Sequence, residues 1–210
     1  TFTFYRRELK NLGTFSESGT SWTSTIESNG KVKASQQVDL GLTINQGGKT
    51  YKVIFAKSNL TQEGLATNEY DYGDYFAWGA TEPWYSSATQ TWKNDKPGGY
   101  TAANAPYYSN GKYTSGNTLE AADDAARQIL KGDWQIPTKE IWAALVNNST
   151  KVWDSTNKGY KFTKNSQTLF LPAAGYVRGK SLEGVGSYGY YWSGTAFSNA
   201  DYPNTKAYYL

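Results

Sequence analysis

Apolar and polar residues alternate at the start of the middle part of the chain, which is the pattern of a β-strand with one buried face. The alternation runs through Val38–Leu42, and a second apolar run covers residues 51–56 (YKVIFA). Between them lies Gly47-Gly48, and paired glycines at such a place favour a tight turn. The pattern therefore predicts a β-hairpin.

Residues 1–37 have a different texture. Thr1–Leu12 alternates and predicts one strand, whereas residues 14–37 are rich in Ser, Thr, Gly and Asn. That composition fits a loose pair of strands, a linker or a disordered leader. We treat residues 1–37 as an N-terminal strand and linker segment that precedes a domain formed by residues 38–210.

Aromatic residues dominate the next part of the chain. Residues 60–69 are polar and predict a loop, and residues 70–79 (YDYGDYFAWG) predict an aromatic strand. Residues 83–115 form a long insertion with little periodicity. A loop of that length inside a compact domain is usually functional or mobile.

Two segments have helical periodicity. Residues 118–130 place their apolar side chains near one face, with Thr118 as a capping residue and Gly132 as a stop. A second helix begins after Thr138, which is a favourable N-cap. Its apolar stripe consists of Ile141, Trp142, Leu145 and Val146.

The last third predicts strands again. Residues 151–168 read as a hairpin with a turn at residues 157–159, and residues 169–171 and 190–192 are two short apolar runs. Five glycines lie between these runs (Gly175, Gly179, Gly184, Gly186 and Gly189). Glycine at this density indicates a backbone that turns tightly or passes close to another segment.

The composition limits the kinds of chemistry that the chain can perform. The 210 residues carry a net charge of +3 without a basic run, which gives little support for nucleic-acid binding. Cys, His and Met are all absent, so disulfides, thiol nucleophiles, thiolate metal sites and imidazole catalysis are excluded. No apolar run approaches the roughly 20 residues of a membrane span. The aromatic fraction of 16% means that much of the core consists of Trp, Tyr and Phe.

Five motifs occur in a fixed order: VDLGL, DYGDYFAWG, GDWQIPTKEIWAAL, LPAAGY and GSYGYYWSGT. Together they resemble the Fibrobacter succinogenes major paralogous domain family, from Val38 to Leu210. This family belongs to the formylglycine-generating-enzyme-like branch of the C-type lectin fold. The resemblance implies an α+β domain in which two helices pack on a small, twisted, mostly antiparallel sheet with long loops.

The same resemblance carries further expectations. Family members are exported by Gram-negative bacteria, so it implies an extracellular or cell-surface location. They usually continue into a closing strand, so residues 38–210 are expected to lack the last strand. Residues 1–37 lie outside the resemblance and are interpreted as the tail of a preceding fimbrillin-like domain. In retroelement-diversified proteins of this fold, the segment after the YYWS-like motif carries the ligand-contacting residues.

Three kinds of site chemistry can be weighed from the residues. Formylglycine-generating oxidases need paired cysteines, which this chain does not have. Residues 82–84 (EPW) and 92–95 (WKND) partly match the calcium motifs of C-type lectins, but they supply too few oxygen ligands. A structural calcium near Asp71 and Asp74 competes with the commoner role of aspartates in capping turns.

Acid–base catalysis requires two carboxylates at a defined separation. The candidates are Asp71, Asp74, Glu82, Asp123 and Asp124. Asp123 and Asp124 are neighbours on a predicted helix and point in different directions. Solvated surface acids are the default interpretation of all five.

The strongest candidate is a binding face between Ser187 and Tyr208, because its composition is that of recognition loops, which combine rigid aromatic rings with adaptable hydrogen-bonding groups. The predicted ligand-binding residues are Tyr188, Tyr190, Phe197, Asn199, Asp201, Tyr202 and Asn204. The alternative is that these tyrosines pack the core, which is nearly as favourable for Tyr190 and Tyr191. Trp192 is expected to face the core beside Phe170 and Trp134. In the glycine loop, Arg178 and Lys180 either hold an anion or form a solvated turn.

These observations together predict a non-catalytic, adhesin-like binding module that recognises a glycan or a protein through the late loop. No metal, cofactor, nucleic acid or membrane span is expected. The alternatives are a structural pilus or cell-surface subunit that assembles through residues 1–37, and a carboxylate-based enzyme such as a glycoside hydrolase.

Overall fold

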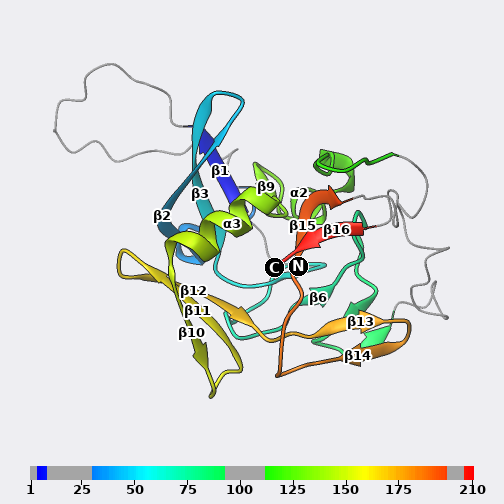
Figure 1. Cartoon of the computed structure of the whole chain (residues 1–210). Coiled ribbons are helices and arrows are strands. Elements are labelled where there is room, and N and C mark those ends of the chain that lie inside the picture. Colours follow the sequence, from blue (N-terminus) through cyan, green and yellow to red (C-terminus); the bar gives the residue numbers. More distant parts are fainter. Residues whose placement is uncertain (1–3, 9–29, 93–111, 198–205) are drawn as a thin grey trace.

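The structure is a computed structural model, in which residues 4–8, 30–92, 112–197 and 206–210 are described. Every strand pair in it is antiparallel, and the strands form several small sheets instead of one large one (Figure 1). The largest sheet has the order β2-β3-β1-β9, and two others have the orders β10-β11-β12 and β6-β7-β8. The pairs β13-β14, β15-β16 and β4-β5 complete the set.

The strand bounds are short except in the two main hairpins. They are β1 Phe4–Glu8, β2 Gln37–Gln46, β3 Lys49–Ala56, β4 Leu60–Thr61, β5 Gly64–Leu65, β6 Asp74–Tyr75, β7 Tyr85–Ser86, β8 Thr91–Trp92, β9 Trp134–Gln135, β10 Thr150–Asp154, β11 Gly159–Lys164, β12 Gln167–Pro172, β13 Tyr176–Arg178, β14 Ser181–Glu183, β15 Trp192–Phe197 and β16 Lys206–Tyr209. The helices are α2 Ala125–Leu130 and α3 Lys139–Asn148, with single 3-10 turns at Ala34–Gln36 and Ala121–Asp123.

The expected α+β class, with two helices packed on one small sheet as in C-type lectin-like domains, is wrong. Strands make up 43% of the structure and helices 14%, so the fold is mainly β. The described helices have only six and ten residues, and they contact opposite edges of the same four-stranded sheet: α2 lies against β9, and α3 lies against β2. Two helices this short cannot cover a sheet as a common layer.

The predicted hairpins are confirmed. In β2 the side chains of Val38, Leu40, Leu42 and Ile44 are buried in alternation. Gly47 and Gly48 form the turn with φ of 57° and 74°, which is a backbone conformation that suits glycine. The hairpin of β10 and β11 also forms, and β12 continues from it.

Strand β1 comes from the N-terminal segment, yet it pairs with β3 on one side and β9 on the other. Val32 is buried as well, and Lys31 N donates to Leu130 O at 2.7 Å. These parts of residues 1–37 therefore share a sheet and a core with the rest of the chain.

The helix predicted at residues 118–130 is shorter than expected, because its N-cap is Asp124, six residues after the predicted cap Thr118. Leu119 N donates to Gly194 O, and Thr118 bridges Thr195, so both residues are held in extended conformation beside β15. The helix starts after Asp124, whose Oδ1 accepts from Arg127 N at 3.0 Å as a true N-cap. The second helix starts after Thr138, as predicted.

The aromatic strand predicted at residues 70–79 is also wrong for most of its length, since only Asp74 and Tyr75 are in a strand. The polar loop predicted at residues 60–69 contains the small β4–β5 hairpin. At residues 190–192 the strand begins at Trp192, not Tyr190. Of the residues described, no helix is long and apolar enough to cross a membrane.

Candidate functional site

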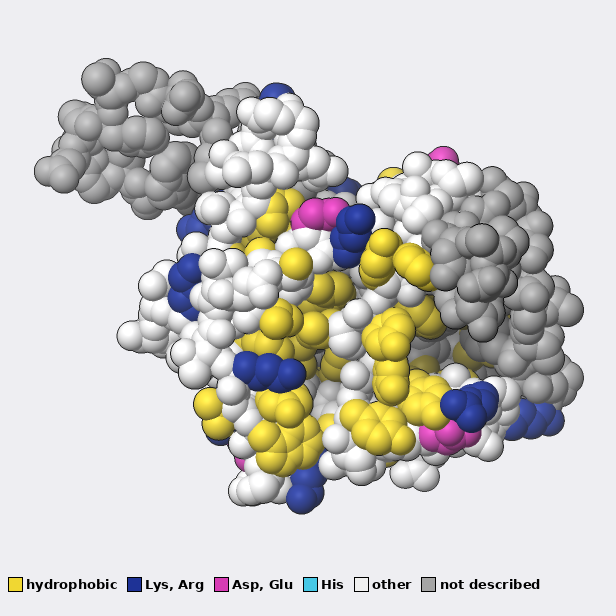
Figure 2. Space-filling view, viewed as in Figure 1, with side chains coloured by type: hydrophobic (Ala, Val, Ile, Leu, Met, Phe, Trp, Pro, Cys, Tyr) yellow, Lys and Arg dark blue, Asp and Glu magenta, His cyan; other side chains and the backbone are white. Residues whose placement is uncertain are grey.

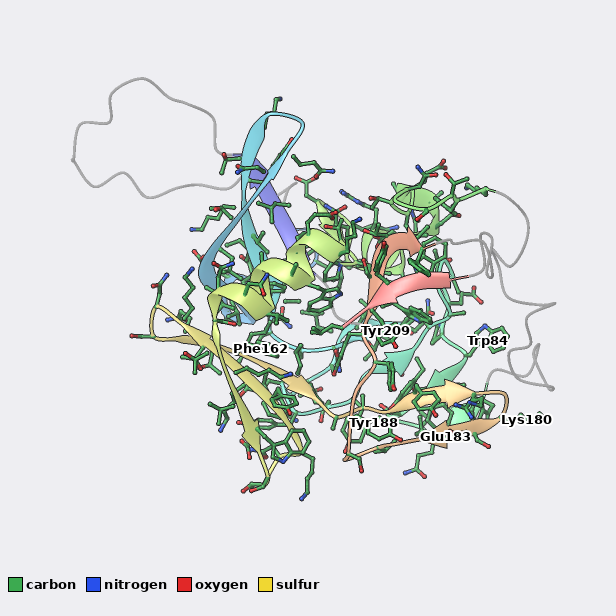
Figure 3. All side chains as sticks on the ribbon, viewed as in Figure 1. Trp84, Phe162, Lys180, Glu183, Tyr188 and Tyr209 are labelled. Carbon is green, nitrogen blue, oxygen red and sulfur yellow. The ribbon has the colours of Figure 1, made fainter. Side chains whose placement is uncertain are left out.

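Four tyrosine side chains from three parts of the chain meet on one face of the molecule. Tyr176 begins β13, Tyr188 and Tyr190 lie in the loop after β14, and Tyr209 is in β16. We call these four residues the tyrosine surface. Figure 2 shows apolar side chains gathered over β13, β14 and β16, and Figure 3 labels two of the tyrosines.

The rings contact one another in a continuous chain. The ring centroids of Tyr188 and Tyr190 are 5.9 Å apart with the planes at 87°, and Tyr190 lies 5.0 Å from Tyr209. Tyr176 stacks on Tyr188 at 6.4 Å and meets Tyr190 edge-on at 5.1 Å. Tyr188, Tyr190 and Tyr209 are nevertheless 49%, 48% and 59% exposed. Mutual contact therefore holds the rings in place while a large part of each remains open to solvent.

The backbone beneath the tyrosine surface depends on glycines with positive φ that allow close contacts. Gly175 has φ of 67°, and its N–H donates to Tyr188 O at 2.7 Å, while Tyr190 N donates back to Gly175 O. Gly184 also has positive φ, and an added Cβ there would overlap the ring of Tyr188. Of the five glycines recognised in the sequence, Gly175 and Gly189 are the positions at which an added Cβ would meet the backbone of another segment.

Charged groups border the tyrosine surface on the β13–β14 hairpin. The Tyr176 hydroxyl donates to Glu183 Oε2 at 2.6 Å and accepts from Arg178 Nη2 at 2.9 Å. The hydrogen bond to Glu183 raises the pKa of Tyr176 above its ordinary value. Arg178 also lies 3.8 Å from the Glu183 carboxylate, so its guanidinium is engaged by neighbours within the hairpin.

Aromatic side chains also fix the irregular backbone behind this surface. The buried hydroxyl of Tyr191 donates to Pro172 O at 2.6 Å and accepts from Asn59 Nδ2 at 3.3 Å. Burial raises the pKa of Tyr191, so the hydroxyl stays a donor. Tyr75 donates in the same way to Ala174 O at 2.5 Å.

Tryptophan N–H groups donate hydrogen bonds to the backbone at Trp192 and Ser193. Trp78 Nε1 donates to Ser193 O at 2.8 Å, and Trp142 Nε1 donates to Trp192 O at 3.2 Å. Trp192 itself is half-buried, and its Nε1 donates to Phe76 O. The fully buried residue of this run is Tyr191, which belongs to the core cluster. The expectation that Trp192 faces the core is therefore only partly met.

The other predicted binding residues divide into two groups. Phe197 is half-buried and contacts Tyr208 at 5.1 Å, and Tyr208 points away from its strand neighbour Tyr209. Phe197 is therefore not part of the tyrosine surface. The remaining predicted residues lie outside the described part of the chain: Asn199, Asp201, Tyr202 and Asn204.

Sequence reasoning missed Tyr176 and Tyr209 as members of the site. Tyr176 directly follows the LPAAG motif, and Tyr209 lies in the last apolar run. Only the pairing of Trp192 with Tyr209 brings β16 beside Tyr190.

Four of the five carboxylates considered for catalysis have structural roles, and the fifth, Glu82, is exposed. Asp71 Oδ2 accepts from Asn68 N at 2.8 Å, and Asp74 Oδ2 accepts from Gln62 N at 2.9 Å. Asp123 accepts from Lys112 and Tyr113, and Asp124 caps α2. Within the described residues, no three acidic side chains gather as a set of metal ligands.

Comparisons with family models, with curated proteins and with solved structures found no match, so the assignment of a function depends on the site itself.

Proposed function

We propose that this chain is a non-catalytic binding module that recognises a glycan or a protein through the tyrosine surface. The observation that carries the proposal is the meeting of Tyr188, Tyr190 and Tyr209, each about half exposed, on a braced backbone. Tyrosine supplies a large contact area with few rotatable bonds, so little conformational entropy is lost when a partner binds. Arg178 at the border adds a further residue type that is enriched in binding hot spots.

The rigid frame supports the same proposal. The carbonyl groups of Pro172, Ala174, Trp192 and Ser193 each accept a hydrogen bond from a Tyr or Trp side chain. A backbone that is already ordered presents its side chains at lower cost than a loop that must order on binding. The structural roles of Asp71, Asp74, Asp123 and Asp124 favour binding over carboxylate catalysis.

Export to the bacterial surface is part of the proposal and is supported by the motif resemblance alone. The adhesin-like role and the alternative role as a pilus or cell-surface subunit share this location. They differ in whether the tyrosine surface binds a foreign ligand or another subunit.

The test is a glycan array together with a panel of purified extracellular host proteins. The wild type is compared with the double variant Tyr188→Ala/Tyr190→Ala, and Tyr160→Ala is the matched control. Tyr160 is also an exposed tyrosine, but it lies on the β10–β11 hairpin. We expect the double variant to lose at least about tenfold in affinity, or roughly 1.4 kcal/mol, and the control to bind like the wild type.

Two results would contradict the proposal. In the first, the double variant and the control lose the same affinity, which would place the ligand elsewhere. In the second, substrate is turned over and a single carboxylate substitution abolishes turnover, which would support the enzyme alternative. Assembly of the chain into polymers that the double variant cannot form would favour the subunit role.

A further inference from the structure

A pocket lies apart from the tyrosine surface, between the segment of residues 61–74 and the β7–β8 hairpin. Its volume is about 1260 Å³. That is large enough for several linked sugar rings, since pockets for drug-sized ligands have volumes of roughly 300–1,000 Å³. The lining residues are Thr61, Gln62, Glu63, Leu65, Ala66, Thr67, Tyr70, Asp71, Tyr72, Gly73, Asp74, Pro83, Ser86, Ser87, Ala88, Thr89, Thr91 and Trp92.

The charge of this pocket is opposite to that of the chain as a whole. Glu63, Asp71 and Asp74 line it, and among the described lining residues there is no Lys or Arg, although the chain has a net charge of +3. An anionic ligand would be repelled by the carboxylates and would find no cation in the described wall. The lining therefore selects against phosphates, sulfates and uronic acids.

The hydrogen-bonding groups of the wall suit a ligand with many hydroxyls. Thr61, Thr67, Ser86, Thr89 and Thr91 supply hydroxyl groups, which both donate and accept. The Oε1 atom of Gln62 is buried and has no hydrogen-bond partner within the described residues. A buried acceptor of this kind is stabilised when a ligand hydroxyl donates to it.

Two braced aromatic rings complete the lining. Tyr70 is 42% exposed and meets Phe170 edge-on at 4.9 Å, and Trp92 packs on Tyr85 at 4.7 Å. They come from different parts of the chain, Tyr70 from the segment of residues 61–74 and Trp92 from β8. Aromatic faces with polar neighbours match the apolar C–H faces and hydroxyl rims of sugar rings.

We propose that this pocket is a binding site for a neutral oligosaccharide. Tyr70 and Trp92 stack on sugar rings, Gln62 accepts a hydrogen bond from a sugar hydroxyl, and the carboxylates exclude acidic sugars. The site shares no residue with the tyrosine surface, so it stands whether or not that surface binds a ligand. In the part of the chain that the structure describes, Glu63, Asp71 and Asp74 do not gather as a set of metal ligands.

The experiment is calorimetric titration of the purified chain with uncharged hexasaccharides of glucose, mannose, xylose, galactose and N-acetylglucosamine. A hexasaccharide of galacturonic acid is the size-matched acidic probe, and choline is the cationic probe. We expect at least one neutral hexasaccharide to bind with an affinity that does not change between low and high salt, because no charge is neutralised. The acidic and cationic probes are expected not to bind.

Variants locate the binding. Tyr70→Ala and Trp92→Ala are each expected to weaken binding at least about tenfold, and Gln62→Ala by a smaller factor. Tyr160→Ala is the control, since it removes an exposed aromatic ring that belongs neither to the pocket nor to the tyrosine surface and should leave the affinity unchanged. Tyr70 lies in a turn outside the strands and is 42% exposed, so we expect Tyr70→Ala to fold even if Trp92→Ala disturbs the β7–β8 hairpin.

Several outcomes overturn the proposal. It fails if none of the neutral hexasaccharides binds, or if galacturonate or choline binds more tightly than all of them. It also fails if Tyr188→Ala removes the sugar binding while Tyr70→Ala does not, because the ligand would then occupy the tyrosine surface. That last result would leave the proposed function of the tyrosine surface standing, so the two proposals are separable.

Discussion

The tyrosine surface and the β10–β11 hairpin both display exposed aromatic rings, but they are built in different ways. On the hairpin, Trp153 and Tyr160 are direct cross-strand partners 5.1 Å apart, and Lys151 Nζ lies 3.9 Å from the centre of the Tyr160 ring. The rings of the tyrosine surface come from segments that are distant in the sequence. Figure 1 shows the two hairpins, β10–β11 and β13–β14, on different sides of the molecule.

This difference distinguishes aromatic rings that stabilise a strand pair from aromatic rings that are exposed for binding. Cross-strand aromatic pairs and a cation over a ring stabilise the strand pairing itself. Tyr188 and Tyr190 lie in a loop and not in a paired strand. The backbone of this loop is held by hydrogen bonds to Gly175, and the neighbouring segment by hydrogen bonds from the side chains of Tyr75 and Tyr191. We infer that the hairpin rings contribute mainly to folding and the tyrosine surface mainly to binding.

The largest expected effect comes from breaking the backbone under the tyrosine surface. In Gly175→Ala the new Cβ would overlap Glu183 O and approach Val185 N, and φ is already 67°. We expect a loss of about 3 kcal/mol in the free energy of unfolding, measured by urea denaturation. Gly179→Ala is the matched control. Gly179 also has a positive φ, of 58°, but a Cβ added there would meet no other atom, so the substitution should cost only about 1 kcal/mol. Equal losses in the two variants would refute the close approach at Gly175.

A second pair of variants moves one ring without removing it. Gly184→Ala and Gly186→Ala have similar positive φ, but only at Gly184 would the new Cβ meet the Tyr188 ring. We expect Gly184→Ala to lower affinity for the tyrosine-surface ligand about tenfold and Gly186→Ala to change it less than about twofold. The Tyr188 ring signals in the NMR spectrum should shift only in Gly184→Ala. A ring that does not move in that variant would count against the packing described here.

On the β10–β11 hairpin we expect the opposite result, a loss of stability without a loss of affinity. Tyr160→Ala removes the cross-strand contact with Trp153 and the cation contact with Lys151, so we expect about 1 kcal/mol less stability and no change in ligand affinity. Tyr188→Ala should cost less than about 0.5 kcal/mol of stability and should weaken binding. Thermal unfolding and binding assays on the two variants test this crossover. The comparison breaks down if both variants lose affinity equally.

The smallest expected effect is a difference in response to acid. Lys161, and then Asn157, hydrogen-bond to the Asp154 carboxylate and lower the pKa of Asp154 well below its ordinary value. A lowered folded-state pKa stabilises the fold above the unfolded-state pKa of about 4, and this contribution is lost as the pH falls below it. The stability difference between wild type and Asp154→Asn should therefore shrink progressively in acid. A difference that stays constant as the pH falls would exclude this contribution.

The tyrosine surface is tested at alkaline pH instead, through Tyr176. The pKa of Tyr176 is raised by its hydrogen bond to Glu183, so the hydroxyl keeps its proton further into alkaline solution than an isolated tyrosine. NMR titration of labelled tyrosines measures this directly. A Tyr176 that titrates at or below its ordinary value would show that the bond to Glu183 is not formed.

Local patterns were a good guide wherever neighbouring residues make the decisive contacts. The hairpins of β2–β3 and β10–β11 and the start of α3 after Thr138 follow from alternation, turn glycines and an N-cap. Patterns failed at residues 118–124, where helical spacing is overridden by hydrogen bonds of Leu119 to Gly194 and of Arg127 to Asp124. They also failed for the fold class, since periodicity does not reveal how many small sheets the strands form.

In the candidate site, too, some features follow from local sequence and others from contacts between distant residues. The sequence by itself determined that a glycine-rich, tyrosine-rich segment would turn tightly and that no cysteine or histidine chemistry was available, because conformational freedom and functional groups belong to single residues. Only the tertiary structure decided that Tyr190 is exposed and its neighbour Tyr191 is buried. It also brought Tyr176 and Tyr209 to the same face. Those outcomes depend on which distant backbone carbonyls, sheet edges and rings come together, and that is settled when the whole chain packs.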